Sequence, residues 1–380
     1  MSTLSTLSAP SLARLATIYA GSFAVLGAVM PYLALELREQ GVTGLALAAA
    51  MGTLPLGRLL AGPAWSVLAD ATRSQRLILR TACLLAAMGL AALIWGGGMW
   101  AVGAVLLFAV GRAPMGPVID GLTLQALKGD SDHYGSIRRW GSGGYLAATM
   151  TVPLLFTALA IPRLLPGLLL TGLLVLLVWD LPDGAPQPPA KLLPALRALG
   201  ADVPLRWILA CAALHFAAHV AATSFLAVHM ASLGLSEIWA GGALSLGVIV
   251  EIALMSQSRR LLSAVSAERL LLITALVAGG RWVLTALATE GWQLVLLQGS
   301  HGFTFGAFWI AAVALVSSRA DESVTTSAQG LLAAAVGGVG GFIGLTGASI
   351  ISEGSDTTAI FIGGAVLAAA ASGCAWRAAR

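Results

Sequence analysis

Five ionisable side chains lie inside long apolar stretches of this 380-residue chain. They are Asp120 and Arg138 in the first half, and Glu251, Arg281 and His301 in the second half. An arginine can pair with an acid or hold an anionic ligand, and an acid beside a histidine can exchange a proton. A charge at the centre of a lipid-embedded helix costs roughly 2.5 to 3.5 kcal/mol, so it is kept mainly where it lines a cavity, an ion path or a pairing site. These residues therefore indicate transport rather than membrane anchoring.

The composition places most of the chain in lipid. Hydrophobic residues make up 58% of the sequence and charged residues 10%, against about 25% charged in a soluble domain. The net charge is +4, but the basic residues stand in loops between apolar runs rather than in patches with aromatic residues. We therefore expect the lipid bilayer to be the main partner and nucleic acid not to be one.

Twelve apolar segments can be marked along the chain, each long enough to approach or cross a bilayer. They are 12–35, 44–67, 77–96, 99–127, 138–160, 163–180, 204–230, 237–257, 268–289, 291–317, 324–350 and 357–376. The sequence thus predicts an all-α membrane protein with twelve transmembrane helices in two pseudo-symmetric six-helix halves. The halves are 1–180 and 204–380, joined by a polar, proline-containing linker at 181–203. Such paired halves are typical of transporters with a site between them.

The distribution of basic residues predicts the orientation. If both termini are cytoplasmic, sixteen of the 21 lysines and arginines fall on the cytoplasmic side and only Arg38 and Arg163 on the outer side. This asymmetry follows the positive-inside rule. We expect a multi-pass protein of a bacterial inner (plasma) membrane with both termini and the 181–203 linker in the cytoplasm.

The three second-half residues occupy similar depths. Counted at about 1.5 Å per residue, Glu251, Arg281 and His301 each lie about 15 to 21 Å from one end of their predicted helix. An acid near an arginine and a histidine can hold or release a proton according to whether the arginine engages it. The alternative is a buried Glu251–Arg281 pair that only fixes helix positions, with His301 as a core residue.

The first-half charges leave more alternatives open. A short connection separates Asp120 from Arg138, so antiparallel helices would bring them to one depth, where an unpaired Arg138 could grip a carboxylate. An ordinary pair at the helix ends is the alternative. Arg58 and Arg112 are either cavity cations for an anionic solute or partners of Asp120.

No motif of enzyme chemistry accompanies these charges. The sequence lacks a Gly-x-Ser-x-Gly elbow, a phosphate-cradling loop and a CxxC pair, so we expect no enzyme. His215 and His219 share a helical face, but without a nearby carboxylate they do not predict a metal site. No cofactor is expected, and the proton gradient is the expected driving force.

Two stretches give the chain a family resemblance. PMGPVIDGLTLQAL (114–127) and YGSIRRWGSGGYL (134–146) resemble the fourth and fifth helices of the 3-phenylpropionate permease group of the major facilitator superfamily, a relative of the lactose permease and the nucleoside–proton symporters. LSLGVIVEIALMSQSRRLL (244–262), GGRWVL (279–284) and GSHGFTFGAFWIAA (299–312) continue it. The similarity covers nearly the whole chain.

The resemblance implies roles for particular residues. Asp120 and Arg138 match an acid and an arginine that engage substrate in the lactose permease, and His219 matches a histidine of the phenylpropionate permease group. The second-half trio matches a charged network that couples protons. One departure matters: Thr304 stands where the lactose permease has a proton-carrying glutamate, so proton carriage would pass to Glu251 or His301.

The superfamily's loop motif after the second span is degraded. SVLADATRSQR (66–76) keeps Asp70, Arg73 and Arg76, whereas Ser66 and Ala71 replace the usual glycine and arginine. Gating by Asp70 against a helix N-terminus remains an expectation.

The sequence therefore predicts a secondary transporter that moves a small organic solute together with protons by alternating access, functioning as a monomer. An aromatic monocarboxylate is the favoured solute, a sugar or nucleoside the alternative, and proton-driven export the alternative direction. A membrane sensor or scaffold is the non-transport alternative, although the loops are short for an output domain. The candidate substrate-binding residues are Asp120, Arg138, Arg112, His219, Trp282 and Trp309.

Overall fold

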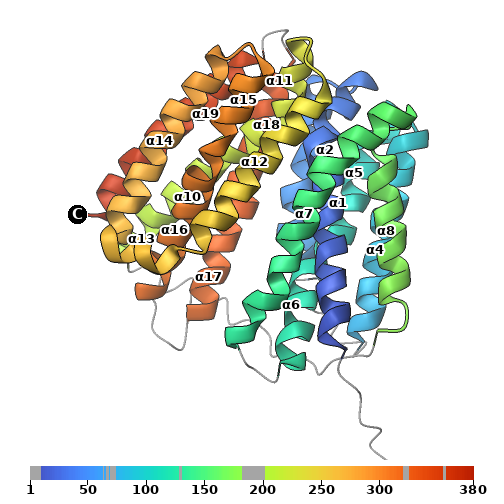
Figure 1. Ribbon diagram of the computed structural model, residues 1–380, viewed down its shortest axis with the longest axis horizontal. Helices are drawn as coiled ribbons and strands as arrows, with labels where there is room; N and C mark the ends of the chain where they lie inside the picture. Colours follow the sequence, from blue (N-terminus) through green and yellow to red (C-terminus); the bar gives the residue numbers. More distant parts are fainter. Residues whose placement is uncertain are drawn as a thin grey trace, which may run out of the picture. The chain divides into compact units, whose positions relative to one another are not determined.

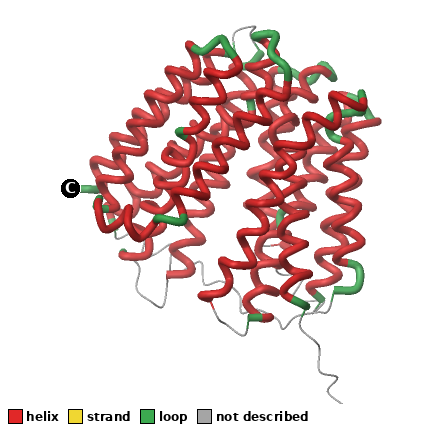
Figure 2. Tube along the Cα trace, viewed as in Figure 1, coloured by secondary structure: helices red, strands yellow, loops and turns green. Residues whose placement is uncertain are grey.

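The structure of the chain is a computed structural model. It describes residues 10–62, 64–65, 68, 74–127, 131–181, 202–319, 325–353 and 357–380. Throughout these ranges the chain forms helices joined by loops, without a strand (Figure 2). This is the backbone that lipid demands, because a helix satisfies its own N–H and C=O groups where no water can.

The chain divides into two compact units, which we call the first and second unit. The first unit comprises Met1–Met30 and Leu56–Pro189, and the second comprises Pro31–Pro55 and Ala190–Arg380. The boundary at Pro189 falls inside the predicted linker, of which residues 182–201 lie outside the described residues.

Two helices run through both units, α1 (Leu12–Glu39) and α2 (Gly44–Leu56). Their 31–55 portion packs within the second unit: Arg38 donates a hydrogen bond to the carbonyl of Ser352, and Gly52 lies against the Thr346 and Phe342 side chains. These contacts explain why the second unit includes a segment from the start of the chain.

The other helices of the first unit follow in chain order (Figure 1). They are η1 (Gly57–Ala61), α4 (Gln75–Trp95), η2 (Gly98–Trp100), α5 (Ala101–Arg112), α6 (Met115–Ala126), α7 (Ser131–Leu159) and α8 (Leu165–Val178). Arg14 in α1 pairs with Asp180 just beyond α8, and this hydrogen bond holds the pKa of the exposed Asp180 carboxyl below its usual range.

The second unit contains the remaining helices. They are α10 (Val203–Ser224), α11 (Leu226–Ser232), α12 (Glu237–Met255), α13 (Ser258–Ala264), α14 (Ala267–Leu287), α15 (Gly291–Gly299), η3 (Gly302–Ala307), α16 (Phe308–Ser318), α17 (Thr325–Ala333), η4 (Ala334–Gly340), α18 (Gly341–Ile351) and α19 (Thr358–Ala378). Its core uses small side chains: Ala212, Ala275, Ala311 and Ala371 are fully buried. Small residues let helices approach closely, which drives packing in lipid.

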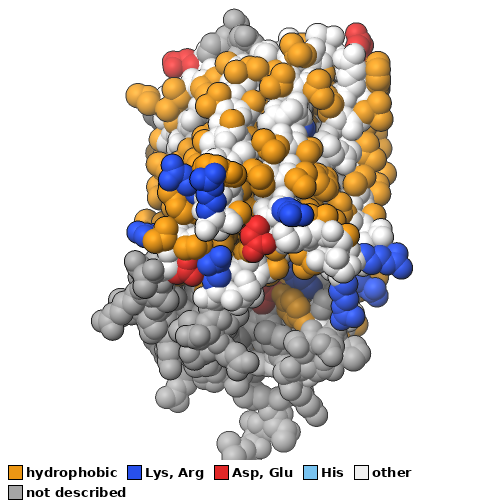
Figure 3. Space-filling view, turned by 90° about the vertical axis from the view of Figure 1, so that its left-hand side faces the viewer, with side chains coloured by type: hydrophobic (Ala, Val, Ile, Leu, Met, Phe, Trp, Pro, Cys, Tyr) orange, Lys and Arg blue, Asp and Glu red, His pale blue; other side chains and the backbone are white. Residues whose placement is uncertain are grey.

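The helices have the length and surface of membrane spans. In the described ranges, eleven are long and apolar enough to cross a bilayer, and α8 is a shorter apolar helix. On α14, Leu276, Leu284 and Leu287 are more than half exposed, as expected of side chains that face lipid. Figure 3 shows apolar side chains over the upper and middle part of one face, with most basic side chains gathered toward its lower part. This banding agrees with a protein that sits across a membrane.

Candidate functional site

Four helical segments of the second unit carry the predicted charged network. Helix α12 provides Glu251, α14 provides Arg281, and His301 lies at the junction of α15 and η3. The η3 segment is a π-helix, a geometry often found at functional sites. It begins at Gly302, where a Cβ atom would lie 2.6 Å from the backbone nitrogen of Glu251. Only glycine allows α12 and η3 to approach this closely, and the approach brings Glu251 and His301 together.

Glu251 pairs with His301. The Oε2 atom of Glu251 lies 3.3 Å from Nε2 of His301, and the two side chains are 20% and 11% exposed. The structure thus joins the two residues that sequence reasoning offered as alternative proton carriers. A carboxylate and an imidazole at this distance can share and pass a proton.

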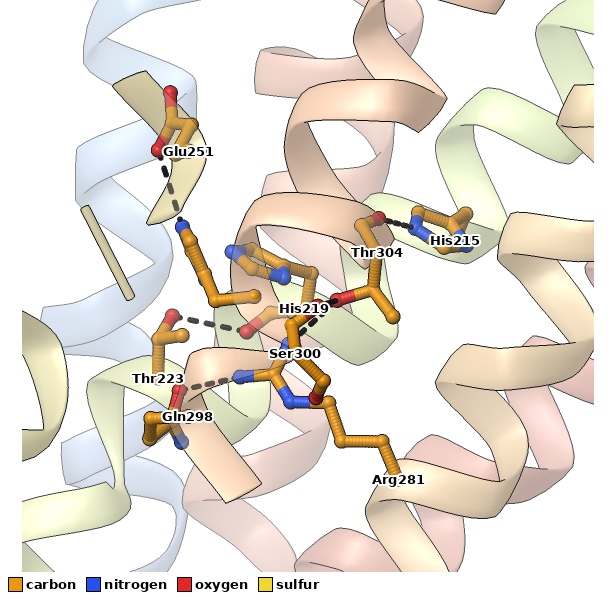
Figure 4. A network of polar contacts seen from close by, with 9 residues as sticks. His215, His219, Thr223, Glu251, Arg281, Gln298, Ser300 and Thr304 are labelled. Atoms are coloured by element: carbon orange, nitrogen blue, oxygen red, sulfur yellow. Dashed lines mark hydrogen bonds and ion pairs between the residues drawn. The ribbon is translucent and has the colours of Figure 1, made fainter. Parts of the chain in front are cut away.

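Arg281 has neutral partners instead of Glu251. Its Nη1 atom donates a hydrogen bond to Thr304 Oγ1 at 2.6 Å, and Nη2 donates to the side-chain oxygen of Gln298. The guanidinium also stacks 4.2 Å from the ring centroid of Trp282. Figure 4 shows the guanidinium between Gln298 and Thr304, with Glu251 at the far end of the network. The ion pair considered as the structural alternative, Glu251 with Arg281, is not formed.

Thr304 connects this arginine to helix α10. Its hydroxyl accepts from Arg281, and its backbone carbonyl accepts a hydrogen bond from Nε2 of His215 at 2.6 Å. The residue that departs from the lactose permease pattern therefore acts as a hydrogen-bonding bridge. Sequence reasoning did not assign roles to Gln298 or Thr304. For Gln298 the sequence does contain a signal, because a glutamine inside an apolar run requires a hydrogen-bond partner.

His219 lies among aromatic side chains. Its ring centroid is 4.7 Å from that of His301, 4.9 Å from Phe305 and 6.1 Å from Trp282. Trp309 continues the group, with its ring 6.3 Å from Phe305. The structure thus brings the predicted residues His219, Trp282 and Trp309 into one aromatic group beside the Glu251–His301 pair. Aromatic side chains of this kind can pack against a flat, apolar group of a solute.

In the first unit, Asp120 is held by two tyrosines. Its Oδ1 accepts hydrogen bonds from the hydroxyls of Tyr19 at 2.5 Å and Tyr134 at 2.9 Å. Sequence reasoning had not identified either tyrosine. Their hydroxyls satisfy the carboxylate without a cation.

Arg138 lies over aromatic rings rather than against Asp120. Its guanidinium carbon is 4.4 Å from the Phe23 ring centroid and 5.8 Å from that of Tyr19. The shared neighbour Tyr19 places the two charges in one region, yet no carboxylate of the described chain pairs with Arg138. Its hydrogen-bonding nitrogens are therefore available to a ligand.

Arg112 and Arg58 also have no acidic partner within the described ranges. Nη1 of Arg112 donates to the Ser22 hydroxyl at 3.1 Å, while its Nε is buried without a partner. Arg58 lies on the π-helical segment η1. Neither arginine is a recorded partner of Asp120, whose oxygen accepts from Tyr19 and Tyr134, and their role as cavity cations stays a prediction.

The predicted gating residues fall at the edge of the described chain. Asp70 and Arg73 lie outside the described residues, whereas Arg76 is in the first turn of α4. Ser74 caps this helix by accepting a hydrogen bond from the backbone N–H of Leu77 at 3.2 Å.

A bundle of apolar helices that carries arginines, acids and histidines within its spans is the architecture of a secondary transporter. The model of the MFS_1 like family matches residues 12–362. The chain therefore belongs to this family, and the predicted membership of the major facilitator superfamily is confirmed. Its relatives are permeases and transporters, so the protein is a transporter and not an enzyme.

Two relatives resemble the chain over most of its length. The maltose permease of Geobacillus stearothermophilus is 29% identical over 332 residues, which cover 84% of this chain and 82% of the relative. A probable 3-phenylpropionic acid transporter of Escherichia coli (strain K12) is 29% identical over 327 residues, which cover 82% of this chain and 84% of the relative.

Solved structures confirm the predicted all-helical fold class. The nucleoside transporter NupG superposes with a TM-score of 0.83 at 18% identity and covers 97% of this chain and 98% of its own. The POT family transporter PepTSo superposes with a TM-score of 0.77 at 12% identity, covering 97% of both chains.

Proposed function

We propose that this transporter moves a small organic anion, with an aromatic monocarboxylate as the first candidate, and that it couples this movement to protons. The observation that carries the proposal is that arginines within the spans lack carboxylate partners, while the acids within the spans already have partners. Arg112, Arg138 and Arg281 have no carboxylate partner in the described chain, whereas Asp120 and Glu251 are already hydrogen-bonded. Unpaired cations in a low-dielectric interior favour an anionic ligand.

The proposal that the solute carries an aromatic group is supported by the side chains around His219. Its neighbours Phe305 and Trp282, together with Trp309, form an aromatic group of the kind that packs against a planar solute. The relative that is a probable 3-phenylpropionic acid transporter supports the same class.

Coupling to protons rests on the Glu251–His301 pair. Both groups are partly accessible, and neither pairs with Arg281, which is held by Gln298 and Thr304. Protonation of Glu251 would neutralise it and release His301. Symport is the proposed mode, and proton-driven export would use the same pair in the opposite direction.

A neutral sugar or nucleoside is the second candidate solute. Asp120, held by Tyr19 and Tyr134, offers hydroxyl and carboxylate oxygens of the type that bind sugar hydroxyls. The maltose permease among the relatives supports this alternative.

Uptake into proteoliposomes separates these candidates. Purified protein is reconstituted with an inward proton gradient and offered labelled 3-phenylpropionate, maltose or uridine. We expect 3-phenylpropionate to accumulate, and we expect this accumulation to collapse when the pH gradient is dissipated. Accumulation of maltose or uridine, with no uptake of the acid, would replace the proposed solute class. Failure to accumulate any of the three would refute the proposed solute class together with its sugar and nucleoside alternatives.

We propose that the protein functions as a monomer in a bacterial inner membrane, with the six-helix halves 1–180 and 204–380 working by alternating access. Arg76, with Asp70 and Arg73, is the proposed gating element. The linker 181–203 and both termini are proposed to be cytoplasmic, as the distribution of basic residues predicts.

A further inference from the structure

Arg281 is a buried charge whose direct partners are neutral. Its side chain is 2% exposed, and the two groups that accept its hydrogen bonds are the amide oxygen of Gln298 and the hydroxyl of Thr304. Within the described chain no carboxylate lies at ion-pair distance from it. Removing an ion from water costs several kcal/mol unless a counter-charge compensates for it. Arg281 therefore requires compensation that the neighbouring side chains do not supply.

Three hydrogen-bond donors in this cluster also have no partner. They are Nε of Arg281, Nε2 of Gln298 and Nε1 of Trp282, and all three are buried. Gln298 presents its oxygen to the guanidinium, so its NH₂ group must point elsewhere. Buried polar groups are nearly always satisfied, and an exception calls for an explanation. Since all three groups are donors, the missing partner is an acceptor.

The nearby acceptors are directed elsewhere. Glu251 pairs with His301 and the Thr304 carbonyl accepts from His215, and no acceptor of the described chain lies within hydrogen-bond distance of the three donors. The face of Trp282 attracts the guanidinium, but a cation–π contact contributes about 0.5 to 2 kcal/mol, less than the cost of burying the charge. A water molecule would satisfy the donors but would leave the charge uncompensated.

We propose that Arg281, Gln298 and Trp282 form a binding site for one small anionic group. Nη1 and Nη2 of Arg281 each donate to a protein group, whereas Nε and the Gln298 amide have no partner, so we assign the ligand to these two. A single anionic atom can accept from both, and it is either one carboxylate oxygen of the transported solute or a halide ion. The first source rests on the proposed function, whereas the second does not depend on it.

The test is thermal unfolding of the purified full-length protein in a buffer in which Hepes is the only anion and serves as the reference. Sodium chloride and sodium 3-phenylpropionate are titrated separately against sodium Hepes at equal ionic strength. A saturable rise in Tm with chloride assigns the site to an inorganic anion, and a rise with the acid alone assigns it to the solute carboxylate. No saturable response to either salt would show that water satisfies the donors and would overturn the proposal.

Gln298→Glu supplies the missing counter-charge from within the chain. It should raise Tm in the Hepes buffer and abolish the anion response, because a carboxylate then lies beside the guanidinium. Gln293→Glu is the matched control on the same helix, since its side-chain oxygen accepts from the backbone N–H groups of Thr289 and Glu290 and a glutamate can do the same. This control should keep the full response. A parental response in Gln298→Glu would contradict the site.

Arg281→Gln should abolish the anion response as well, because it removes the charge. Uptake measurements on the same preparations keep the two proposals apart. A chloride response without any acid uptake would refute the proposed solute and leave the anion site intact. Acid uptake without an Arg281-dependent response would refute the site and leave the proposed function intact.

Discussion

Glu251 has a histidine as its partner, and this determines what its removal should do. A glutamate paired with Arg281 would leave a buried, unpaired guanidinium when replaced, at a cost of about 3 to 5 kcal/mol. The observed partner is His301, which can be neutral, while Arg281 keeps Gln298 and Thr304. The folded state should therefore tolerate Glu251→Gln.

We expect Glu251→Gln to exchange solute across the membrane but to lose proton-driven accumulation, because glutamine imitates the protonated acid permanently. Counterflow and accumulation are measured in the same proteoliposomes, with Glu268→Gln, at the start of α14, as the control. Accumulation at the parental level would remove Glu251 from the mechanism and leave His301 as the proton carrier. Loss of both activities together with a fall in Tm would indicate a structural role.

Arg138 allows a second test at the level of a single side chain. Arg138→Lys keeps the charge but loses the planar fork that binds a carboxylate and stacks on Phe23. We expect apparent affinity for the acid to fall about tenfold, which corresponds to about 1.4 kcal/mol. Arg139→Lys is the matched control, because Arg139 is adjacent and exposed. Equal affinities of the parent and of Arg138→Lys would exclude Arg138 from the solute site.

At the scale of elements, the approach of η3 to α12 positions the proton pair. A Cβ on Gly302 would lie 2.6 Å from the backbone of Val250 and Glu251, where no flexible side chain can give way. Gly302→Ala should therefore separate the two segments, destabilise the protein by about 1 to 3 kcal/mol through overpacking, and impair accumulation. Gly280→Ala, with nothing within 4 Å of the added carbon, should leave Tm and accumulation near the parental values. Similar behaviour of the two variants would mean that the close approach is not required.

The elements also show what sequence can predict. Apolar length located the spans because lipid selects for it, yet it did not locate their interruptions. The predicted segment 99–127 contains a break between α5 and α6, where Pro114 lacks a backbone N–H, and 204–230 breaks near Phe225. The π-helical turn η3 packs closely against α12 at Gly302, and no apolar pattern records either feature.

For the site, too, the sequence predicted part of the arrangement: the depth of the charged residues, but not their partners. Counting residues placed Glu251, Arg281 and His301 at similar depths, and depth alone allowed any pairing among them. Which groups meet depends on the face that each helix presents to its neighbours, so the partners of Arg281 and of Asp120 required coordinates.

For the whole molecule, orientation in the membrane is the property that sequence predicts most directly. Helix α12 is bounded by two capping serines, Ser236 and Ser256, that are both exposed. Its 19 residues span about 28 Å at 1.5 Å per residue, close to the thickness of a hydrocarbon core. Exposed Arg259 and Arg260 follow Ser256 closely, so the positive-inside rule assigns that end to the cytoplasm.

We therefore expect single cysteines at Ser236 and Ser256 to react from opposite sides of the membrane. The background lacks Cys83, Cys211 and Cys374, and each variant is treated in intact cells with a membrane-impermeant maleimide. Ser236→Cys should be labelled in intact cells, whereas Ser256→Cys should be labelled only after permeabilisation, because lipid separates the two ends of α12. The reverse pattern would place the basic ends of the helices outside and invert the topology. Labelling of both cysteines from one side would mean that α12 does not cross the membrane, and the twelve-span arrangement would then be wrong.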